Sequence, residues 1–319
     1  MTISSALRAV GRMERGDHLC LAYVDADERR SVLFSYVRDG LAAEHKIVYL
    51  ADQESPHVLP VCLRPRPARL ETLPQAAGLD LAAALDDGRL VIRTVAEVYR
   101  GTRGFRPGET MGLLATETEL ALLQGHRGIR LTGEWPLLPP APATGRPVDL
   151  AAEAEFLARR VAACERRVEP VLRGARIVAM MLCQYDRRRL PAPRLERMES
   201  HHHARARADD LYDDGSLRVT PLFSPPGLAL TGTLDAATRP ALDRVLRVLP
   251  PGAGLVCLDL SGLHSCDEEG LRRIVEAGRT SGGRQRQVLL RGVPPRLAGM
   301  LRATGLERAP GVSIGEPAH

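Results

Sequence analysis

The stretch "LVCLDLSGLHSCDEEGLRRIVEAG" (Leu255–Gly278) decides the fold of the second half of this chain. An apolar run is followed by a turn, three acids stand in a row at Asp267–Glu269, and a glycine then opens a segment with helical spacing. Leu271, Ile274 and Val275 would face inward, because residues three and four apart share one side of a helix. The pattern predicts a buried strand that leads through an acidic turn into a helix.

The segments around this stretch extend the same pattern. Strands are expected in "GLALTGTLD" (Gly227–Asp235), "RQVLLRGV" (Arg286–Val293) and "GVSI" (Gly311–Ile314). Helices are expected in "AATRPALDRVLRVL" (Ala236–Leu249) and "PPRLAGMLRATGL" (Pro294–Leu306), the second ending at Gly305. The second half therefore reads as a small α/β domain.

The first half alternates apolar strands with amphipathic helices. Strands are expected at His18–Val24, Lys46–Asp52, Arg89–Val95, Gly128–Trp135 and Ala175–Asp186, and helices at Asp27–Leu41, Glu109–Gly125 and Val148–Val168. Nearly continuous apolar strands that alternate with helices are typical of a parallel sheet covered on both faces. We therefore expect two α/β domains.

A polar stretch from about Pro191 to Ser216 separates the two halves. It contains "HHH" (His201–His203), which we interpret as part of a solvated linker. The domain organisation expected from the sequence is listed here: an N-terminal segment at 1–14, a first domain at 15–200, a linker at 201–215 and a second domain at 216–319.

Composition and charge argue against two classes of partner. The net charge of the 319 residues is +5 and the aromatic fraction is 3%. The most basic stretch, "RLERMESHHHARARADD" (Arg194–Asp210), is interrupted by acids, so we expect no nucleic acid as partner. No apolar run reaches the roughly 18 residues of a membrane span, and the N-terminus does not resemble a secretory signal. We expect a cytoplasmic protein without a membrane anchor.

The six cysteines do not form a metal or disulfide motif. They are Cys20, Cys62, Cys164, Cys183, Cys257 and Cys266, and none belongs to a CxxC pair. In a cytosolic chain of this length we expect them to be reduced.

Four elements of the second half resemble the STAS domain, the fold of bacterial anti-sigma-factor antagonists. They are "LTGTLDAATRPAL", "LVCLDLSGLHSCDEEGLRRI", "QVLLRGVPPRLAGML" and "ATGL", in this order. In that family the strand-to-helix turn usually reads Asp-Ser-Ser-Gly, and a serine kinase that doubles as an anti-sigma factor phosphorylates the serine before the glycine. The resemblance implies that Asp267 is retained here and that Glu269 occupies the phosphoacceptor position.

The resemblance also implies a partner and a binding surface. The partner would be an anti-sigma factor of the serine-kinase type, and the surface would begin at the phosphosite-equivalent turn. The turn residues are Asp267, Glu268, Glu269 and Gly270, with Thr233, Asp235, Ser261 and Ser265 in support. Glu269 would either imitate a phosphoserine or simply block phosphorylation.

A second interpretation of the acidic turn needs no partner. Asp267 would cap the helix, and the two glutamates would interact favourably with the helix dipole in its first turn.

Three motifs of the first half resemble the MEDS domain, a sensory module of methanogen and methylotroph regulators. They are "GDHLCLAYVDADER" (Gly16–Arg29), "GIRLTGEW" (Gly128–Trp135) and "LCQYDRRRL" (Leu182–Leu190). The family is similar to RecA-type α/β folds, so the resemblance implies a RecA-like, parallel-sheet sensor domain. A sensor joined to a STAS domain is the layout of stressosome-type regulators.

The candidate sensing residues lie on the first and last of the expected strands. Alternate residues of a strand face one side, so His18 and Cys20 share a side, as do Cys183 and Tyr185. If the two strands are neighbours, His18, Cys20 and Cys183 converge, which would suit a soft metal, haem or thiol chemistry. The alternative, which we favour, is that they are small buried side chains, so we expect no metal site.

The candidate ligand-sensing residues are His18, Cys20, Cys183, Tyr185, Asp186 and Arg187. The last two lie at the end of their strand, where ligands of open α/β sheets bind.

The sequence assigns no cofactor to the first half. A RecA-like ATPase would carry G-x-x-x-x-G-K-[ST] after the first strand, whereas "VDADERRS" (Val24–Ser31) has neither glycine nor lysine. We expect no ATP hydrolysis.

The sequence as a whole reads as a cytoplasmic signalling regulator without catalysis of its own. It would be a sensor-linked anti-sigma-factor antagonist that controls transcription in a stress response, with a small molecule or a redox change as its input. One alternative is a thiol- or metal-dependent enzyme or redox sensor centred on His18, Cys20 and Cys183. Another is a non-switching STAS scaffold subunit in a large STAS assembly. A homo-oligomer is a further candidate among the partners.

Overall fold

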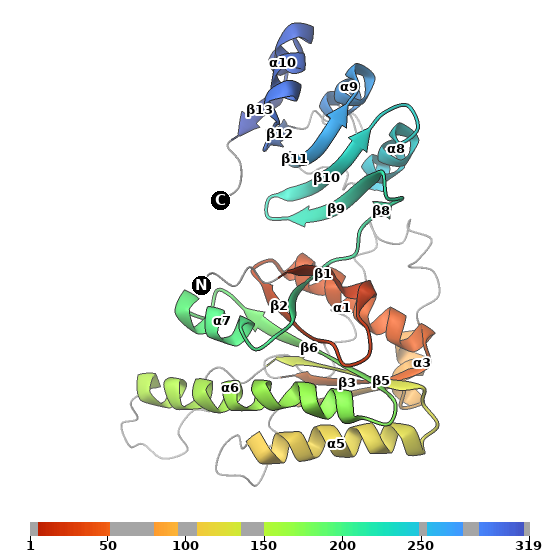
Figure 1. The fold of residues 1–319 in the computed structure, drawn as a ribbon, viewed down its shortest axis with the longest axis vertical. Helices are drawn as coiled ribbons and strands as arrows, with labels where there is room; N and C mark the ends of the chain where they lie inside the picture. The colour runs from red at the N-terminus through yellow and green to blue at the C-terminus, as the bar shows by residue number, and fades with distance from the viewer. Residues whose placement is uncertain are drawn as a thin grey trace. The chain divides into compact units, whose positions relative to one another are not determined.

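The computed structural model of the chain describes residues 6–51, 80–94, 107–134, 150–248, 254–276 and 287–315. Within these residues the chain divides into two compact units, and the boundary along the chain lies between Arg207 and Ala208. Figure 1 shows the elements of both units.

The first unit is a parallel sheet with helices on both faces. Its strands are β1 (Leu7–Ala9), β2 (His18–Tyr23), β3 (His45–Ala51), β4 (Leu90–Thr94), β5 (Gly128–Glu134), β6 (Val178–Asp186) and β7 (Ala204–Arg207). Its helices are α1 (Ala26–Ala42), α3 (Leu81–Asp86), α5 (Pro107–Leu123), α6 (Leu150–Gly174) and α7 (Ala192–Glu199), with a 3-10 turn, η1, at Val10–Arg12. The strand order is β1-β7-β2-β6-β5-β3-β4, and every pairing is parallel.

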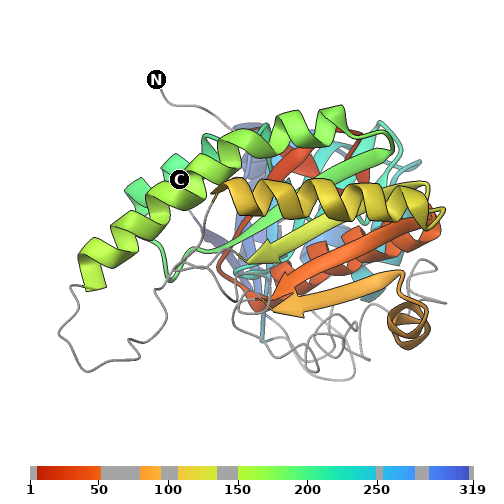
Figure 2. The ribbon, with the colours of Figure 1, turned by 90° about the horizontal axis from the view of Figure 1, so that it is seen from below.

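The two faces of this sheet are covered by different helices. Helices α5 and α6 run side by side along one face, and α1 lies along the other (Figures 1 and 2). Apolar residues of β2, β5 and β6 form one buried cluster with α5, α6 and α7. On the opposite face the Tyr36 hydroxyl, on α1, lies 3.1 Å from the backbone oxygens of both Leu131 and Met180. The parallel sheet expected from the alternation of strands and helices is confirmed.

The first unit extends further along the chain than expected. Residues 201–215 were expected to be a linker, but Ala204–Arg207 forms β7 and pairs with both β1 and β2. The "ARAR" sequence alternates small buried side chains with arginines, since Ala204 is 2% and Ala206 5% exposed. This is the two-residue period of a strand, which the flanking charges concealed.

The second unit is a smaller mixed sheet with three described helices. Its strands are β8 (Tyr212–Asp213), β9 (Leu217–Phe223), β10 (Pro226–Leu234), β11 (Leu255–Cys266), β12 (Gln287–Arg291) and β13 (Val312–Gly315). Its helices are α8 (Arg239–Val248), α9 (Glu268–Glu276) and α10 (Pro295–Thr304), with a 3-10 turn, η2, at Leu306–Arg308. The order is β13-β12-β11-β10-β9-β8, in which β9 runs antiparallel to both of its neighbours.

Strand β11 is longer than the sequence indicated. We expected a turn after the apolar run, but the strand continues to Cys266, because β10 accompanies it through two irregularities of register. The helix that follows was predicted correctly, with Leu271, Ile274 and Val275 at most 1% exposed. The end of α10 is also as expected, since Gly305 has a φ of 71° that suits a glycine.

Two further expectations can be compared with the described residues. Five of the six cysteines fall there, and all five are buried and form no disulfide; Cys62 lies outside the described ranges. None of the helices in the described ranges is long and apolar enough to span a membrane.

Gly227 allows the close approach of β10 and β11, and its replacement is our first prediction. A Cβ atom there would lie 1.8 Å from the Cys257 backbone oxygen. We expect Gly227→Ala to lower the stability of the second unit by about 1–3 kcal/mol, as overpacking does. Hydrogen exchange of the β11 amides in the full chain measures the change.

The matched control is Gly299→Ala in α10, where a Cβ atom would meet nothing within 4 Å. This variant should gain about 0.5–1 kcal/mol, because alanine favours a helix interior over glycine. Equal protection of β11 in both variants would contradict the close approach of the two strands.

Candidate functional sites

The acidic turn lies at the carboxyl ends of two neighbouring strands. Strands β10 and β11 are parallel, with Thr233 opposite Ser265 and Leu234 opposite Cys266. The Asp267 backbone N–H donates to the Leu234 oxygen at 3.0 Å. The loops that follow the two strands therefore start side by side.

Asp267 caps α9 in the manner expected of a helix N-terminus. Its Oδ1 accepts a hydrogen bond from the Gly270 N–H at 2.6 Å. A Cβ atom on Gly270 would lie 2.9 Å from that oxygen and 2.9 Å from Leu234 Cγ, so a larger residue would disturb the cap. The second interpretation of the turn, as a capped helix start, is thus met by the geometry.

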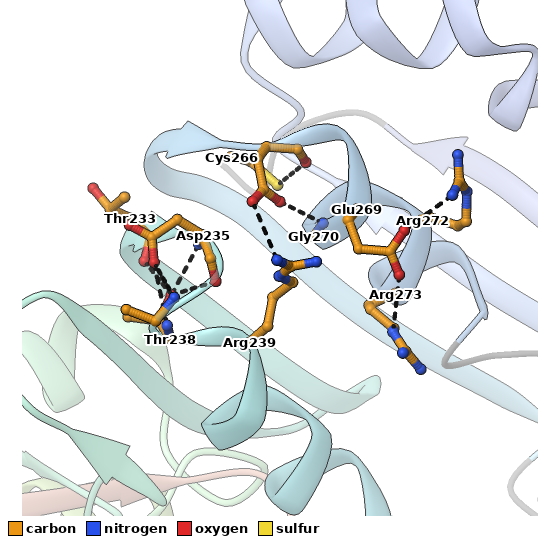
Figure 3. A network of polar contacts seen from close by, with 11 residues as sticks. Thr233, Asp235, Thr238, Arg239, Cys266, Glu269, Gly270, Arg272 and Arg273 are labelled. Carbon is orange, nitrogen blue, oxygen red and sulfur yellow. Dashed lines mark hydrogen bonds and ion pairs between the residues drawn. The ribbon is translucent and has the colours of Figure 1, made fainter.

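The two glutamates of the turn are paired with arginines of their own helix. Arg272 donates to Glu268 at 2.9 Å. Arg272 also donates to Glu269 at 3.0 Å, and Arg273 Nε lies 3.3 Å from Glu269 Oε1 (Figure 3). The Glu269 side chain is 37% exposed and that of Glu268 60% exposed. Both carboxylates are accessible, and neither carries an unpaired charge.

A third arginine reaches the turn from the neighbouring loop. Arg239, the first residue of α8, has its Nη2 atom 3.9 Å from Asp267 Oδ2 (Figure 3). The turn therefore gathers three carboxylates and three guanidinium groups. Sequence reasoning missed all three arginines. The i,i+3 and i,i+4 spacing could have revealed Arg272 and Arg273, but no local pattern marks Arg239, whose approach depends on strand pairing.

The supporting residues divide into two groups. The Asp235 carboxylate accepts hydrogen bonds from the backbone N–H groups of Thr238 at 3.2 Å and Ala237 at 2.9 Å, and these bonds lower the pKa of Asp235. The Thr238 hydroxyl in turn donates to the Thr233 oxygen at 3.1 Å, which closes the loop after β10. Ser261 belongs to a different group of contacts, since its N–H donates to Asp259 at 3.0 Å.

In the first unit the structure brings His18 and Cys183 together. Strands β2 and β6 are neighbours, and His18 Nε2 lies 3.3 Å from Cys183 Sγ. Both side chains contact Glu165 of α6: His18 Nε2 is 2.8 Å and Cys183 Sγ 3.6 Å from Glu165 Oε2. The Tyr185 hydroxyl donates to the other oxygen of the same carboxylate. All four side chains are fully buried.

His202 completes this group and corrects our interpretation of "HHH" as a solvated patch. The turn after α7 directs His202 inward, so that its side chain is 0% exposed and its Nε2 lies 3.4 Å from Glu165 Oε2. Its ring centroid is 4.1 Å from that of His18. The neighbouring His203 is partly exposed and pairs with Glu169 of α6 at 3.0 Å.

Burial keeps the two inner histidines neutral. Desolvation lowers the pKa of both His18 and His202 to about 3. Burial also raises the pKa of Cys20 to about 12, and the Cys20 Sγ contacts the Ala204 oxygen at 3.9 Å. The expected convergence therefore holds for His18 and Cys183, whereas Cys20 is not part of the group that includes Glu165 and His202.

Asp186 and Arg187 lie apart from this buried group. Asp186 ends β6, and its carboxylate binds the Arg188 side chain at 2.7 and 2.9 Å, while Arg187 is exposed. On the side of β6 opposite Cys183, Gln184 accepts a hydrogen bond from Arg29 Nε at 2.9 Å. Arg29 also pairs with Glu134, at the carboxyl end of β5.

The start of α1 is occupied by its own cap. Asp25 Oδ1 accepts hydrogen bonds from the N–H groups of Asp27 at 2.7 Å and Glu28 at 3.3 Å. In a phosphate-binding loop such amides face the phosphates. Here a carboxylate binds them and two more acids follow.

The cap at Asp267 yields a second prediction. Asp267→Ala should lower the stability of α9 by about 1 kcal/mol, because the Gly270 N–H loses its acceptor. Asp267→Asn should retain most of that stability, since an amide oxygen can also cap a helix. Hydrogen exchange of the α9 amides in the full chain measures both, and equal protection in the wild type and the alanine variant would show that the cap is dispensable.

Two protein families match the chain. The MEDS family, described as "MEthanogen/methylotroph, DcmR Sensory domain", matches residues 17–203. The family STAS_2, described as "Mlab, STAS domain", matches residues 218–314. A comparison with curated proteins finds no match.

Among solved structures, a KaiC-like protein from the hyperthermophilic archaeon Pyrococcus horikoshii OT3 is 11% identical with a TM-score of 0.33. The match covers 54% of this chain and 64% of that one, so the chain spans less than two thirds of that protein. The MEDS match covers more than half of the 319 residues. The chain belongs to the MEDS family and carries a STAS domain after its sensory domain.

Proposed function

We propose that this chain is a sensor-linked anti-sigma-factor antagonist that binds a serine-kinase-type anti-sigma factor through the turn at Asp267–Gly270. The STAS match supports a signalling role through protein binding, and the MEDS match supports a sensory input. The turn is suited to such contacts because Glu268 and Glu269 are accessible at the start of α9.

The observation that carries the proposal is the charge balance of the turn. The carboxylates of Asp267, Glu268 and Glu269 are matched by the guanidinium groups of Arg239, Arg272 and Arg273. A phosphoserine would add about −1.5 to −2 charges. Glu269 adds only −1, and two arginines within its own helix compensate that charge. Glu269 therefore blocks phosphorylation without imitating phosphate, and the turn stays competent to bind.

Control of binding then lies with the sensory domain. Position 269 offers no hydroxyl to a kinase, so the input must reach the STAS domain by another route. The chain passes from β7 directly into the second unit at Ala208. A structural change at β7 could thus be transmitted to the output domain through the polypeptide chain itself.

The buried group around His18 and Cys183 favours sensing over catalysis. His18, Glu165, Cys183 and His202 have no solvent-exposed side-chain surface, so a substrate would have no direct access to them. The two matched families are regulatory and sensory, which agrees with a role without turnover.

Affinity capture tests the proposal. The full chain is used as bait in host lysate, bound proteins are identified by mass spectrometry, and the affinity of the identified anti-sigma factor is then measured. We expect the wild type to bind it. The Arg272→Gln/Arg273→Gln double variant should bind about tenfold more weakly, because Glu269 would then present an uncompensated charge beside the interface.

Two variants complete the design. Arg302→Gln, on α10, removes an exposed arginine outside the turn and should bind like the wild type. If the anti-sigma factor binds only to Glu269→Ser, then Glu269 does imitate phosphate and the arginines of the turn do not compensate its charge. If neither wild type nor Glu269→Ser binds such a kinase, the antagonist function is wrong and the scaffold alternative takes its place.

A further inference from the structure

The proposed function assigns no ligand to one chemically unusual group, the buried side chains of His18, Glu165, Cys183 and His202. Each offers one ligand atom, and these four atoms all lie within 4.8 Å of one another. They come from β2, α6, β6 and the turn before β7. The group lies in the sensory domain, and nothing in the STAS-domain proposal requires it.

The orientation of His202 indicates that a cation belongs in this group. Its Nδ1 lies 2.9 Å from the Met198 backbone oxygen, which can only accept, so Nδ1 carries the proton. In the neutral ring, Nε2 then bears a lone pair, and this buried atom has no hydrogen-bond partner. It lies 3.4 Å from a Glu165 oxygen, itself an acceptor. Two acceptors at this distance repel each other unless a proton or a cation lies between them.

The charges of the four groups fit a divalent ion. An imidazole ligates a metal ion in its neutral form, so His18 and His202 add no charge to the site. The carboxylate and a deprotonated thiol supply two negative charges, which neutralise a divalent cation completely. Charge neutrality matters here, since an uncompensated ion in a fully buried site is costly.

Neighbouring groups hold two of these side chains in position. Met198 fixes the tautomer of His202, and the Tyr185 hydroxyl binds the Glu165 oxygen that does not face His18. Metal-binding histidines and carboxylates are usually oriented by partners of this kind.

We infer that His18, Glu165, Cys183 and His202 form a closed binding site for a divalent transition-metal ion of the zinc type. Imidazole, thiolate and carboxylate are the ligands that Zn²⁺ takes, and four protein ligands without an open position are typical of structural sites. On binding, a Cys183 sulfur–metal bond replaces the S–H bond and the thiol proton passes to solvent. No oxidant or reductant takes part.

Cobalt substitution tests the inference on the full chain. The chain is stripped with a chelator and titrated with Co²⁺ at neutral pH. We expect one Co²⁺ per chain, the visible bands of a four-coordinate ion and a thiolate-to-cobalt absorption in the near ultraviolet. Added Zn²⁺ should displace the cobalt and abolish both signals.

Three variants identify the ligands. Cys183→Ser should lose the thiolate absorption, and His202→Ala should weaken Co²⁺ binding at least about tenfold. Cys20→Ser is the matched control, because Cys20 is equally buried and lies opposite Cys183 in the strand pairing, yet stands outside the group. It should behave like the wild type.

A second measurement does not depend on the variants folding. Native mass spectrometry of the wild-type chain, loaded with Zn²⁺ and exchanged into metal-free buffer, should retain one ion. A folded wild type that holds no metal in either experiment, or one whose cobalt complex lacks the thiolate absorption, would overturn the inference. So would a cobalt signal that is lost in Cys20→Ser and kept in Cys183→Ser. None of these readouts involves anti-sigma binding, so the result is independent of the proposed function.

Discussion

The sensory domain is organised around one carboxylate that has no access to water. Glu165 projects from α6 towards the sheet, and its side chain is 0% exposed. A buried carboxylate is tolerated only where hydrogen bonds or a counter-ion replace its hydration. His18 on β2, Cys183 and Tyr185 on β6, and His202 before β7 all reach it. The two oxygens of this carboxylate, on the longest described helix of the domain, thereby contact side chains of β2, of β6 and of the turn before β7.

The STAS domain also places carboxylates close together, but at its surface and at the start of a helix. Three acids would repel one another at the start of α9 if they stood alone. Asp267 is used as the helix cap, and the two glutamates gain from the helix dipole while pairing with arginines one turn later. The same residues thus stabilise the helix and define the surface at its N-terminus. The structural and functional interpretations of the turn do not exclude each other.

Sequence patterns predicted the architecture well, because the architecture depends on local periodicity. The alternation of strands and helices identified both α/β units, and the inward residues of α9 were read from helical spacing alone. Strand β7 was missed because it is only four residues long, so its two-residue alternation repeats just twice, and because two of its four residues are arginines. The extension of β11 was missed since it depends on its pairing with β10.

Local sequence patterns identified only part of the buried group in the sensory domain. His18 and Cys183 were paired correctly, because side-chain parity along a strand is a local property. Glu165 was overlooked within "ACERRVE", where its neighbours make it resemble any charged residue of a helix surface. His202 was dismissed with the two other histidines of its run. Which of three adjacent histidines turns inward is decided by the path of the chain after α7, and that path depends on contacts far apart in the sequence.

The place of β7 in the sheet has a consequence for how the sensory domain is made. Strand β7 is the last strand of its unit, yet it lies between β1 and β2, and among the described residues β1 pairs with no other strand. As the chain leaves the ribosome, β2 to β6 can assemble first, while β1 must wait about two hundred residues for its partner. The sheet is completed only when the sequence next to the STAS domain has been translated. The sensory sheet is therefore completed immediately before the STAS domain is synthesised.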